Sequence, residues 1–290
     1  MQKAITRAPS LRGEIILPGD KSISHRAAIF NAIAVGQARV TNFATGADCR
    51  STLSCLKALG VNFTYSPQPT PSVQITGSGR SGLKEPEDVL NAGNSGTTTR
   101  LLTGLLAAQP FLSVITGDRS LRSRPMGRVI KPLELMGAEI RGRKNNTLAP
   151  LAIKGGALHG ISYTLPVASA QVKSSLILAA ILAEGQSQIE EPALSRDHTE
   201  RLLSAMGALI ERQGNRIAVH PLRGELRAAS LNVPGDISSA AYWLVAAAIH
   251  PQAELKVMHC GINPTRTGIL DILSAMGADI KIVNERLEGG

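Results

Sequence analysis

Aromatic residues, cysteines and long hydrophobic runs are all scarce in this chain of 290 residues. Phe, Trp and Tyr make up only 3% of it, although 43% is hydrophobic, so its cores must be packed from Ala, Leu, Ile and Val. The three cysteines, Cys49, Cys55 and Cys260, lack disulfide or metal-ligand spacing, which is typical of a reduced, cytoplasmic protein. Apolar stretches are broken before they could span a bilayer, and we expect neither a leader peptide nor a membrane span.

The net charge of +9 is unevenly placed, because residues 1–150 carry +10 and the remainder carries −1. Its densest part is a short segment that contains Arg119, Arg122, Arg124, Arg128 and Lys131. Such a segment can be a solvated face, a nucleic-acid site or the site of a small anion. Proteins that bind single-stranded nucleic acid usually add aromatic stacking platforms, and this segment has none. A solvated face and a small anionic ligand therefore remain, and the motifs below favour the ligand.

One five-residue motif occurs four times in closely similar form, each time at the end of an expected helix. It reads LGVNF at 59–63, MGAEI at 136–140, MGALI at 206–210 and MGADI at 276–280, with its glycines 77, 70 and 70 residues apart. In each copy we expect the glycine to close the helix in the left-handed conformation and the chain to leave as a strand. A regular period of this size predicts one supersecondary unit built repeatedly, with apolar faces packed between neighbouring units.

The first part of the unit repeats as well. Capping residues precede a run of small and aliphatic residues in PGDKS at 18–22, NSGT at 94–97, VASA at 167–170 and PGDIS at 234–238. Helices that are apolar on all sides are expected to be buried, whereas those at 199–206 and 268–276 are amphipathic. The predicted unit is strand, buried helix, strand, amphipathic helix, strand, strand. This order predicts an α/β fold.

The segment PGDKSISHR at 18–26 has the composition of an anion site. A Pro-Gly pair turns the chain so that the free N–H groups of the next helix face outward. Lys21, Ser22 and Arg26 then offer an ammonium, a hydroxyl and a guanidinium, which suit phosphate or carboxylate. The spacing is equally consistent with an alternative interpretation, in which Asp20 or Ser22 only caps the helix and the cations are solvated.

Three further loops carry related chemistry. In NAGNSGTTTR at 91–100, Gly96 allows a ligand to approach the backbone, although a glycine-rich turn with Thr capping is the alternative. The pattern is neither a Walker A sequence nor GxGxxG, so no nucleotide is implied. Gln171 and Lys173 interrupt an apolar run, and the pair Asp197–His198 precedes an amphipathic helix. Adjacent residues point to different faces, so we expect this pair to cap the helix rather than form a catalytic dyad.

Four motifs together resemble those of the 5-enolpyruvylshikimate-3-phosphate synthases, in the order and spacing of that family. They are LPGDKSISHRA at 17–27, NAGNSGTTTR at 91–100, SRPMGR at 123–128 and VASAQVKS at 167–174. The resemblance implies an inside-out α/β barrel of two domains, each built from three βαβαββ units, with ligands between them. We expect a complete first domain at 20–232 and a partial second domain, one unit of three, at 1–19 plus 233–290.

The resemblance also implies an activity. The enolpyruvyl group of phosphoenolpyruvate would be transferred to the 5-hydroxyl of shikimate 3-phosphate, and phosphate released, as a step of aromatic amino-acid biosynthesis through the shikimate pathway. It implies an addition–elimination without metal or organic cofactor. The expected partners are these small anionic substrates and glyphosate as an inhibitor, with no nucleic acid and no membrane. A full-length member is expected to be a cytoplasmic monomer.

Site residues carry over by motif position. Lys21 is the expected catalytic residue and would contact both substrates. Shikimate 3-phosphate would be held by Lys21, Ser22, Arg26, Ser169, Ala170, Gln171, Ser195 and Arg196. Phosphoenolpyruvate would be held by Lys21, Asn94, Gly96, Arg124 and Gln171.

Two alternatives remain at this point. The proton acceptor and later cations of the family are expected beyond residue 290, so the chain could be a shikimate 3-phosphate-binding fragment without turnover. A UDP-N-acetylglucosamine enolpyruvyltransferase is disfavoured, because it would carry Lys-Asn in place of Lys21-Ser22 and a cysteine near residues 119–124.

Overall fold

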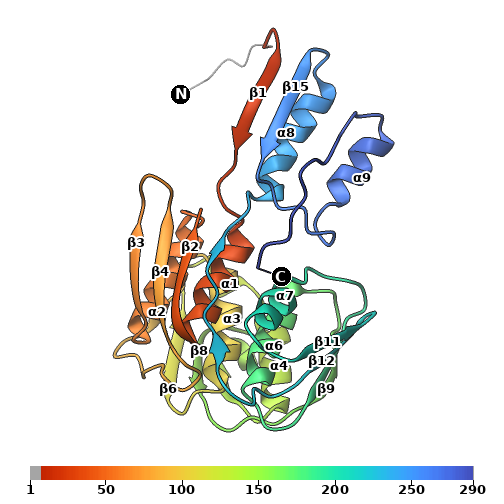
Figure 1. Ribbon diagram of the computed structural model, residues 1–290. Coiled ribbons are helices and arrows are strands. Elements are labelled where there is room, and N and C mark those ends of the chain that lie inside the picture. Colours follow the sequence, from red (N-terminus) through yellow and green to blue (C-terminus); the bar gives the residue numbers. More distant parts are fainter. Residues whose placement is uncertain (1–7, 290) are drawn as a thin grey trace.

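A computed structural model describes residues 8–289 of the chain (Figure 1). The elements form two bodies. The larger body contains helices α1 to α7 and strands β2 to β14, and the smaller body contains β1, α8, β15 and α9. Within residues 8–289, no helix is long and apolar enough to cross a membrane.

The larger body consists of three units, of which the second and third begin with a strand as predicted, whereas the first begins with a helix. The first contains α1 (Lys21–Ala32), β2 (Ala34–Thr41), α2 (Ala47–Ala58), β3 (Asn62–Ser66) and β4 (Ser72–Ser78). The second contains β5 (Leu90–Asn91), α3 (Gly96–Ala107), β6 (Leu112–Thr116), the 3-10 turn η1 (Leu121–Ser123), α4 (Gly127–Leu135), β7 (Glu139–Gly142), α5 (Arg143–Asn146) and β8 (Leu148–Lys154). The third contains β9 (Ser162–Thr164), α6 (Ala170–Ile181), β10 (Ser187–Glu190), α7 (His198–Ala205), β11 (Ile210–Gln213) and β12 (Arg216–Val219).

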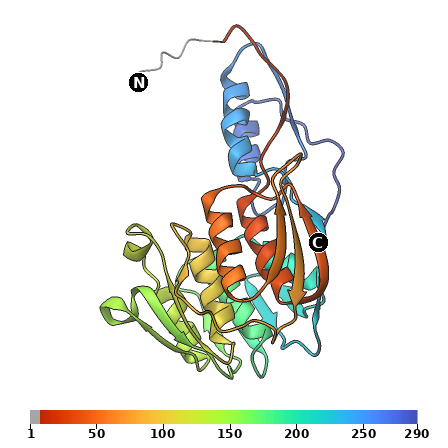
Figure 2. The same cartoon turned by 90° about the vertical axis from the view of Figure 1, so that its left-hand side faces the viewer.

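Each unit forms a separate sheet with the same pairing pattern. In the second unit β5 pairs in parallel with β6, and β8 joins β6 to β7 by antiparallel pairs. The third unit repeats this pattern with β9, β10, β12 and β11. Helices α1, α3 and α6 are buried along almost their whole length and lie between the sheets, as Figure 2 shows for the first two units. The sheets thus lie outside a helical core, as the predicted fold class requires.

In each body, one parallel strand pair joins segments that are far apart in the sequence. The parallel partner of β2 comes from the far end of the larger body, as β13 (Leu226–Arg227) and β14 (Leu231–Asn232). Conversely, β1 (Leu11–Ile16) pairs in parallel with β15 (Ala253–Met258), beside α8 (Ile237–Ile249). The chain therefore passes between the bodies twice. The two passages lie side by side, because Asp20 N donates to Pro234 O at 2.8 Å and Asp236 N donates to Pro18 O at 3.0 Å.

The predicted glycine closures are confirmed at all four positions. Gly60, Gly137, Gly207 and Gly277 have φ angles of +84°, +101°, +104° and +93°. A strand follows the first three, as β3, β7 and β11. The strand predicted after Gly277 is wrong, since residues 278–283 form no strand after α9 (Gly268–Ala275). A strand needs a hydrogen-bonding partner, and within residues 8–289 the sheet of the smaller body consists only of β1 and β15.

The prediction that the apolar helix at residues 240–248 is buried is also wrong. In α8 only Ile237 and Ala240 are buried, while Tyr242 is 81% exposed and Ile249 is 79% exposed. The equivalent helices of the larger body are enclosed by neighbouring units. By contrast, α8 packs mainly against β15 and α9 among the described residues. An apolar helix is buried only where other elements pack against it, and the composition of the helix does not reveal whether they do.

Candidate functional site

The apolar helices α1, α3, α6 and α8 begin with the predicted caps. The side chains of Asp20, Ser95, Ser169 and Asp236 accept hydrogen bonds from the backbone N–H groups of Ile23, Thr98, Val172 and Ser238. Polar side chains also join the N-terminal halves of α1, α3 and α6. Arg26 Nη2 on α1 donates to Ser174 Oγ on α6 at 2.7 Å, and Gln171 Nε2 on α6 donates to Thr97 Oγ1 on α3 at 2.8 Å. Three helix N-termini therefore lie close together.

The start of α1 carries the first set of predicted residues. Lys21 Nζ lies 3.0 Å from Asp48 Oδ2, and the Lys21 side chain is 53% exposed. Ser22 Oγ accepts from Arg196 Nη1 at 3.0 Å. This contact brings together two residues that are 174 positions apart, and it places the 195–196 segment beside α1.

The alternative interpretation, in which the cations of this segment are solvated, is wrong for Arg26. Its side chain is buried, and Nε donates to Thr199 Oγ1 at 2.7 Å while Nη1 donates to the carbonyl oxygen of Ser22 at 2.9 Å. Burial, and then the nearby charge of Arg196, lower the pKa of Arg26 to about 10. Arg26 therefore holds α1, α6 and α7 together and also supplies buried positive charge.

A residue missed by the sequence analysis completes this cationic group. Arg266 lies between β15 and α9, and its guanidinium is 3.4 Å from Asp20 Oδ2 and 3.5 Å from Asp236 Oδ1. Burial, and next the charge of Arg266, lower the pKa of Arg196. The only local signal was a single Arg in the Pro-Thr-Arg-Thr segment before an amphipathic helix.

A second cationic group surrounds the start of α3. Arg124 donates to Asn94 Oδ1, and Arg100 Nη1 donates to Gln171 Oε1 at 2.6 Å. A Cβ atom on Gly96 would lie 2.8 Å from Arg100 Nη1 and 3.2 Å from Arg124 Nη1. Burial, followed by the charges of Arg124 and Arg128, lowers the pKa of Arg100. Arg100, which the motif-based assignment did not include, is therefore part of this group.

The remaining predicted residues lie around α6 and α7. Ser169 caps α6, and Ala170 is buried in its first turn. Ser195 Oγ donates to Glu191, which lies outside the predicted site residues.

The expectation that the Asp197–His198 pair caps α7 is wrong for the side chains. Asp197 occupies the N-cap position but makes no side-chain cap bond. Its carboxylate instead accepts from Asn263 Nδ2 at 2.6 Å and from Thr265 Oγ1 at 3.3 Å. Burial, and next the charge of Arg26, lower the pKa of His198 to about 3. The pair therefore links α7 to the smaller body.

A cleft of about 1420 Å³ opens between the bodies. Its lining includes Asp20, Arg26, His198 and Arg266, together with α8, β15 and residues 277–289. Within residues 8–289, no three His, Cys, Asp or Glu side chains gather as potential metal ligands. What this arrangement offers is a set of fixed cations, hydroxyl groups and helix N-termini, which is suited to binding anions.

A family model described as EPSP synthase (3-phosphoshikimate 1-carboxyvinyltransferase) matches residues 5–288. The chain belongs to this family. It is 52% identical over its whole length to the 3-phosphoshikimate 1-carboxyvinyltransferase of Herpetosiphon aurantiacus, and covers 67% of that protein. It is 55% identical to the enzyme of the same name from Chloroflexus aggregans, with 98% of this chain and 66% of the relative covered.

Solved structures agree with this assignment. An EPSP synthase from Acinetobacter baumannii superposes with a TM-score of 0.90 at 48% identity, over 97% of this chain and 62% of that one. The predicted family and fold class are therefore confirmed. The chain spans about two thirds of the length of these relatives.

Proposed function

We propose that this chain binds shikimate 3-phosphate and serves in the transfer of the enolpyruvyl group of phosphoenolpyruvate to its 5-hydroxyl, with release of phosphate. The observation that carries the proposal is the gathering of Arg26, Arg100 and Arg196 at adjoining helix starts, with pKa values lowered partly by neighbouring cations. Cations that disfavour one another's charge are stabilised when anions bind among them. Membership of the EPSP synthase family supplies the identity of the anions.

We assign shikimate 3-phosphate to the face made by α1, the start of α6 and the 195–196 segment. Its ligands would be Lys21, Ser22, Arg26, Ser169, Ala170, Gln171, Ser195 and Arg196. The contact between Arg196 and Ser22 supports this assignment, because it places a guanidinium and a hydroxyl within reach of one ligand oxygen. Arg26, being buried, would act mainly through its charge and by holding the helices in place.

We assign phosphoenolpyruvate to the start of α3, where Lys21, Asn94, Gly96, Arg124 and Gln171 would hold it and Arg100 adds a further cation. Because Gly96 has no side chain, the guanidinium groups of Arg100 and Arg124 come closer to its backbone than a Cβ atom would allow. Gln171 lies on the boundary between both ligands, since it bonds to Arg100 and Thr97 from the first turn of α6.

The chemistry of this site is positioning and charge neutralisation. Two anionic substrates repel one another, and fixed cations on both sides would bring the 5-hydroxyl close to the enolpyruvyl carbon. The addition–elimination passes through a tetrahedral intermediate, whose developing charge Lys21 is placed to stabilise. Lys21 can serve this role because its side chain is half-exposed, although it pairs with the partly buried Asp48.

A second candidate function is binding of shikimate 3-phosphate without turnover. One observation favours it, namely that the described part of the smaller body holds a single unit with α8 largely exposed. Groups that act on phosphoenolpyruvate from that side would then be missing. A UDP-N-acetylglucosamine enolpyruvyltransferase is not favoured, because the relatives carry the name 3-phosphoshikimate 1-carboxyvinyltransferase.

Calorimetric titration with shikimate 3-phosphate, followed by phosphoenolpyruvate, tests the proposal. We expect saturable binding of the first ligand, and weakening by about 2 kcal/mol in Lys21→Met, since a charge-assisted contact is lost. Lys57→Met is the matched control, because Lys57 is exposed on α2 away from the cations. Absence of binding by the folded chain, or equal effects of both variants, would contradict the assignment.

Further properties belong to the same proposal. We place the first domain at 20–232 and a partial second domain at 1–19 plus 233–290, of which residues 1–7 and 290 lie outside the described residues. The pairing of β1 with β15 and of β14 with β2 supports these boundaries. We propose inhibition by glyphosate at the donor site and a monomeric state for a full-length member. Three free cysteines support a cytoplasmic location.

A further inference from the structure

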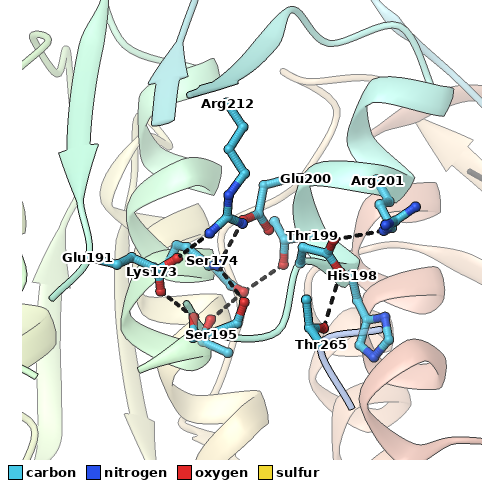
Figure 3. A network of polar contacts seen from close by, with 12 residues as sticks. Lys173, Ser174, Glu191, Ser195, His198, Thr199, Glu200, Arg201, Arg212 and Thr265 are labelled. Atoms are coloured by element: carbon cyan, nitrogen blue, oxygen red, sulfur yellow. Dashed lines mark hydrogen bonds and ion pairs between the residues drawn. The ribbon is translucent and has the colours of Figure 1, made fainter. Parts of the chain in front are cut away.

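Four charged side chains form a network beneath the segment that carries Ser195 (Figure 3). Lys173 on α6 lies 2.8 Å from both Glu191 Oε2 and Glu200 Oε1, and all of its side chain is buried. Arg212 on β11 completes the network, at 3.1 Å from Glu191 and 3.3 Å from Glu200. Two cations are thus matched by two anions, and of the four side chains only that of Arg212 reaches the surface, at 25% exposure.

Stability alone does not account for this network. Removing charges from water costs several kcal/mol per ion, and buried ion pairs are often no more stable than well-packed apolar residues of similar volume. The neighbouring buried positions Leu176, Ile177 and Leu178 of α6 are aliphatic, and they pack without such a cost. A different role is therefore expected for Lys173, and its contacts indicate which.

The network holds Ser195 at two atoms. Lys173 Nζ donates to the carbonyl oxygen of Ser195 at 3.3 Å, and Ser195 Oγ donates to Glu191 Oε1. The backbone and the hydroxyl of Ser195 are thus both fixed by charged groups from below. The next residue is Arg196, which reaches Ser22 at the start of α1.

The same network supports Arg26 from behind. Glu200 follows Thr199, whose Oγ1 accepts from Arg26 Nε at 2.7 Å and bonds to Ser174 Oγ at 2.6 Å. Lys173 and Ser174 are neighbours on α6. On α6, Lys173 therefore joins the ion network and the adjacent Ser174 contacts Arg26. On α7, Glu200 joins the network and the adjacent Thr199 contacts Arg26.

We propose that Lys173 and Glu191 are positioning residues that hold Ser195 as a ligand for the phosphate group of shikimate 3-phosphate. This inference rests on the proposed function. A serine hydroxyl has a single proton, which in this structure is donated to Glu191. Binding of phosphate turns that proton from Glu191 to a phosphate oxygen. Glu191 tolerates the loss because its other oxygen retains Lys173 and Arg212.

The test compares two ligands that differ only in the phosphate group. Dissociation constants for shikimate 3-phosphate and for shikimate are measured by calorimetry, and their ratio reports the contribution of the phosphate subsite. General destabilisation of the fold changes both constants and leaves the ratio unaltered. Displacement of Ser195, by contrast, weakens the binding of shikimate 3-phosphate but not that of shikimate, so it lowers the preference for the phosphorylated ligand.

In Lys173→Met we expect the preference for the phosphorylated ligand to fall about tenfold, the size of effect of one charge-assisted contact. Ser195→Ala should give a similar loss, and Lys173→Met should add little in the Ser195→Ala background, because both changes remove the same contact. The control is Lys154→Met, which removes a cation from an exposed pair with Glu139 on the far sheet and should leave the ratio at the wild-type value.

Lys173→Met alone leaves an unmatched buried anion, so folding is followed by circular dichroism. Lys173→Met/Glu191→Gln removes one charge of each sign and keeps the Arg212–Glu200 pair, so it provides a folded variant with the same expected loss. An unchanged ratio in either folded variant, or fully additive effects of Lys173→Met and Ser195→Ala, overturns the inference. A wild-type chain that binds both ligands equally would instead contradict the proposed function.

Discussion

Asp20 and Asp236 occupy equivalent places where the chain passes between the two bodies, and Arg266 lies within 3.5 Å of both. Each aspartate caps a helix, α1 in the larger body and α8 in the smaller one. Burial, and next the charge of Asp236, raise the pKa of Asp20. One arginine of the smaller body therefore compensates two carboxylates that repel one another at the connection.

We expect Arg266→Met to destabilise the fold by about 3 kcal/mol, because it leaves two neighbouring carboxylates without their cation. The unfolding free energy from urea titration would measure this. Arg286→Met is the control, since Arg286 pairs with Glu288 at an exposed position. Similar small losses in both variants would show that Arg266 does not hold the connection.

Stability is expected to fall as the solution becomes acidic. Burial lowers the pKa of His25, from 6.5 to about 3, and its Nδ1 shares a 2.7 Å hydrogen bond with Thr52 Oγ1. In the unfolded chain His25 binds a proton near pH 6.5, whereas in the folded chain it does so only near pH 3. The contribution of neutral His25 to the free energy of unfolding is therefore fully present above pH 6.5 and is lost as pH falls toward 3.

His25→Asn tests this explanation because the amide can keep the contact with Thr52 without titrating. We expect a shallower decline of the urea midpoint with falling pH in this variant, although His198 still contributes, since its pKa is also lowered to about 3. Parallel pH profiles for wild type and His25→Asn would contradict the role given to His25.

Gly96→Ala is expected to weaken binding of phosphoenolpyruvate and glyphosate while sparing shikimate 3-phosphate. The added methyl group would press on the guanidinium ends of Arg100 and Arg124, which can move without disturbing the backbone. Calorimetry with each ligand separates the effects. Gly268→Ala, where a Cβ meets nothing within 4 Å, is the control. Equal losses for both ligands would show that Gly96 serves folding rather than the donor site.

The purified 290-residue chain is expected to bind shikimate 3-phosphate but to release little phosphate from phosphoenolpyruvate. The donor-site groups assigned above all lie in the larger body. The proton acceptor and the later cations that the family resemblance implies are expected beyond residue 290. Without several such groups acting on one transition state, the rate falls by many orders of magnitude, since each contributes on the order of 10²-fold. A phosphate-release assay measures this, with a full-length relative as the positive control. Substantial turnover by the chain alone would contradict the prediction.

The sequence by itself determined the parts of this protein that follow from local chemistry. Asp20 and Ser95 cap helices because their short polar side chains reach the backbone N–H groups of the next turn. Gly60 and Gly207 end helices because glycine adopts positive φ without steric cost. The repeated pattern of these signals was enough to predict the repeating unit, and the resemblance of the four motifs within residues 17–174 was enough to predict the family and its fold class.

Only the tertiary structure decided which distant residues meet. It showed that β14 rather than β1 pairs with β2, that Arg266 lies between Asp20 and Asp236, and that Lys173 joins an ion network under Ser195. It also left α8 exposed, although its composition predicts burial. Strand pairing, ion pairing and burial depend on groups far apart in sequence. Their geometry is fixed only when the units pack together.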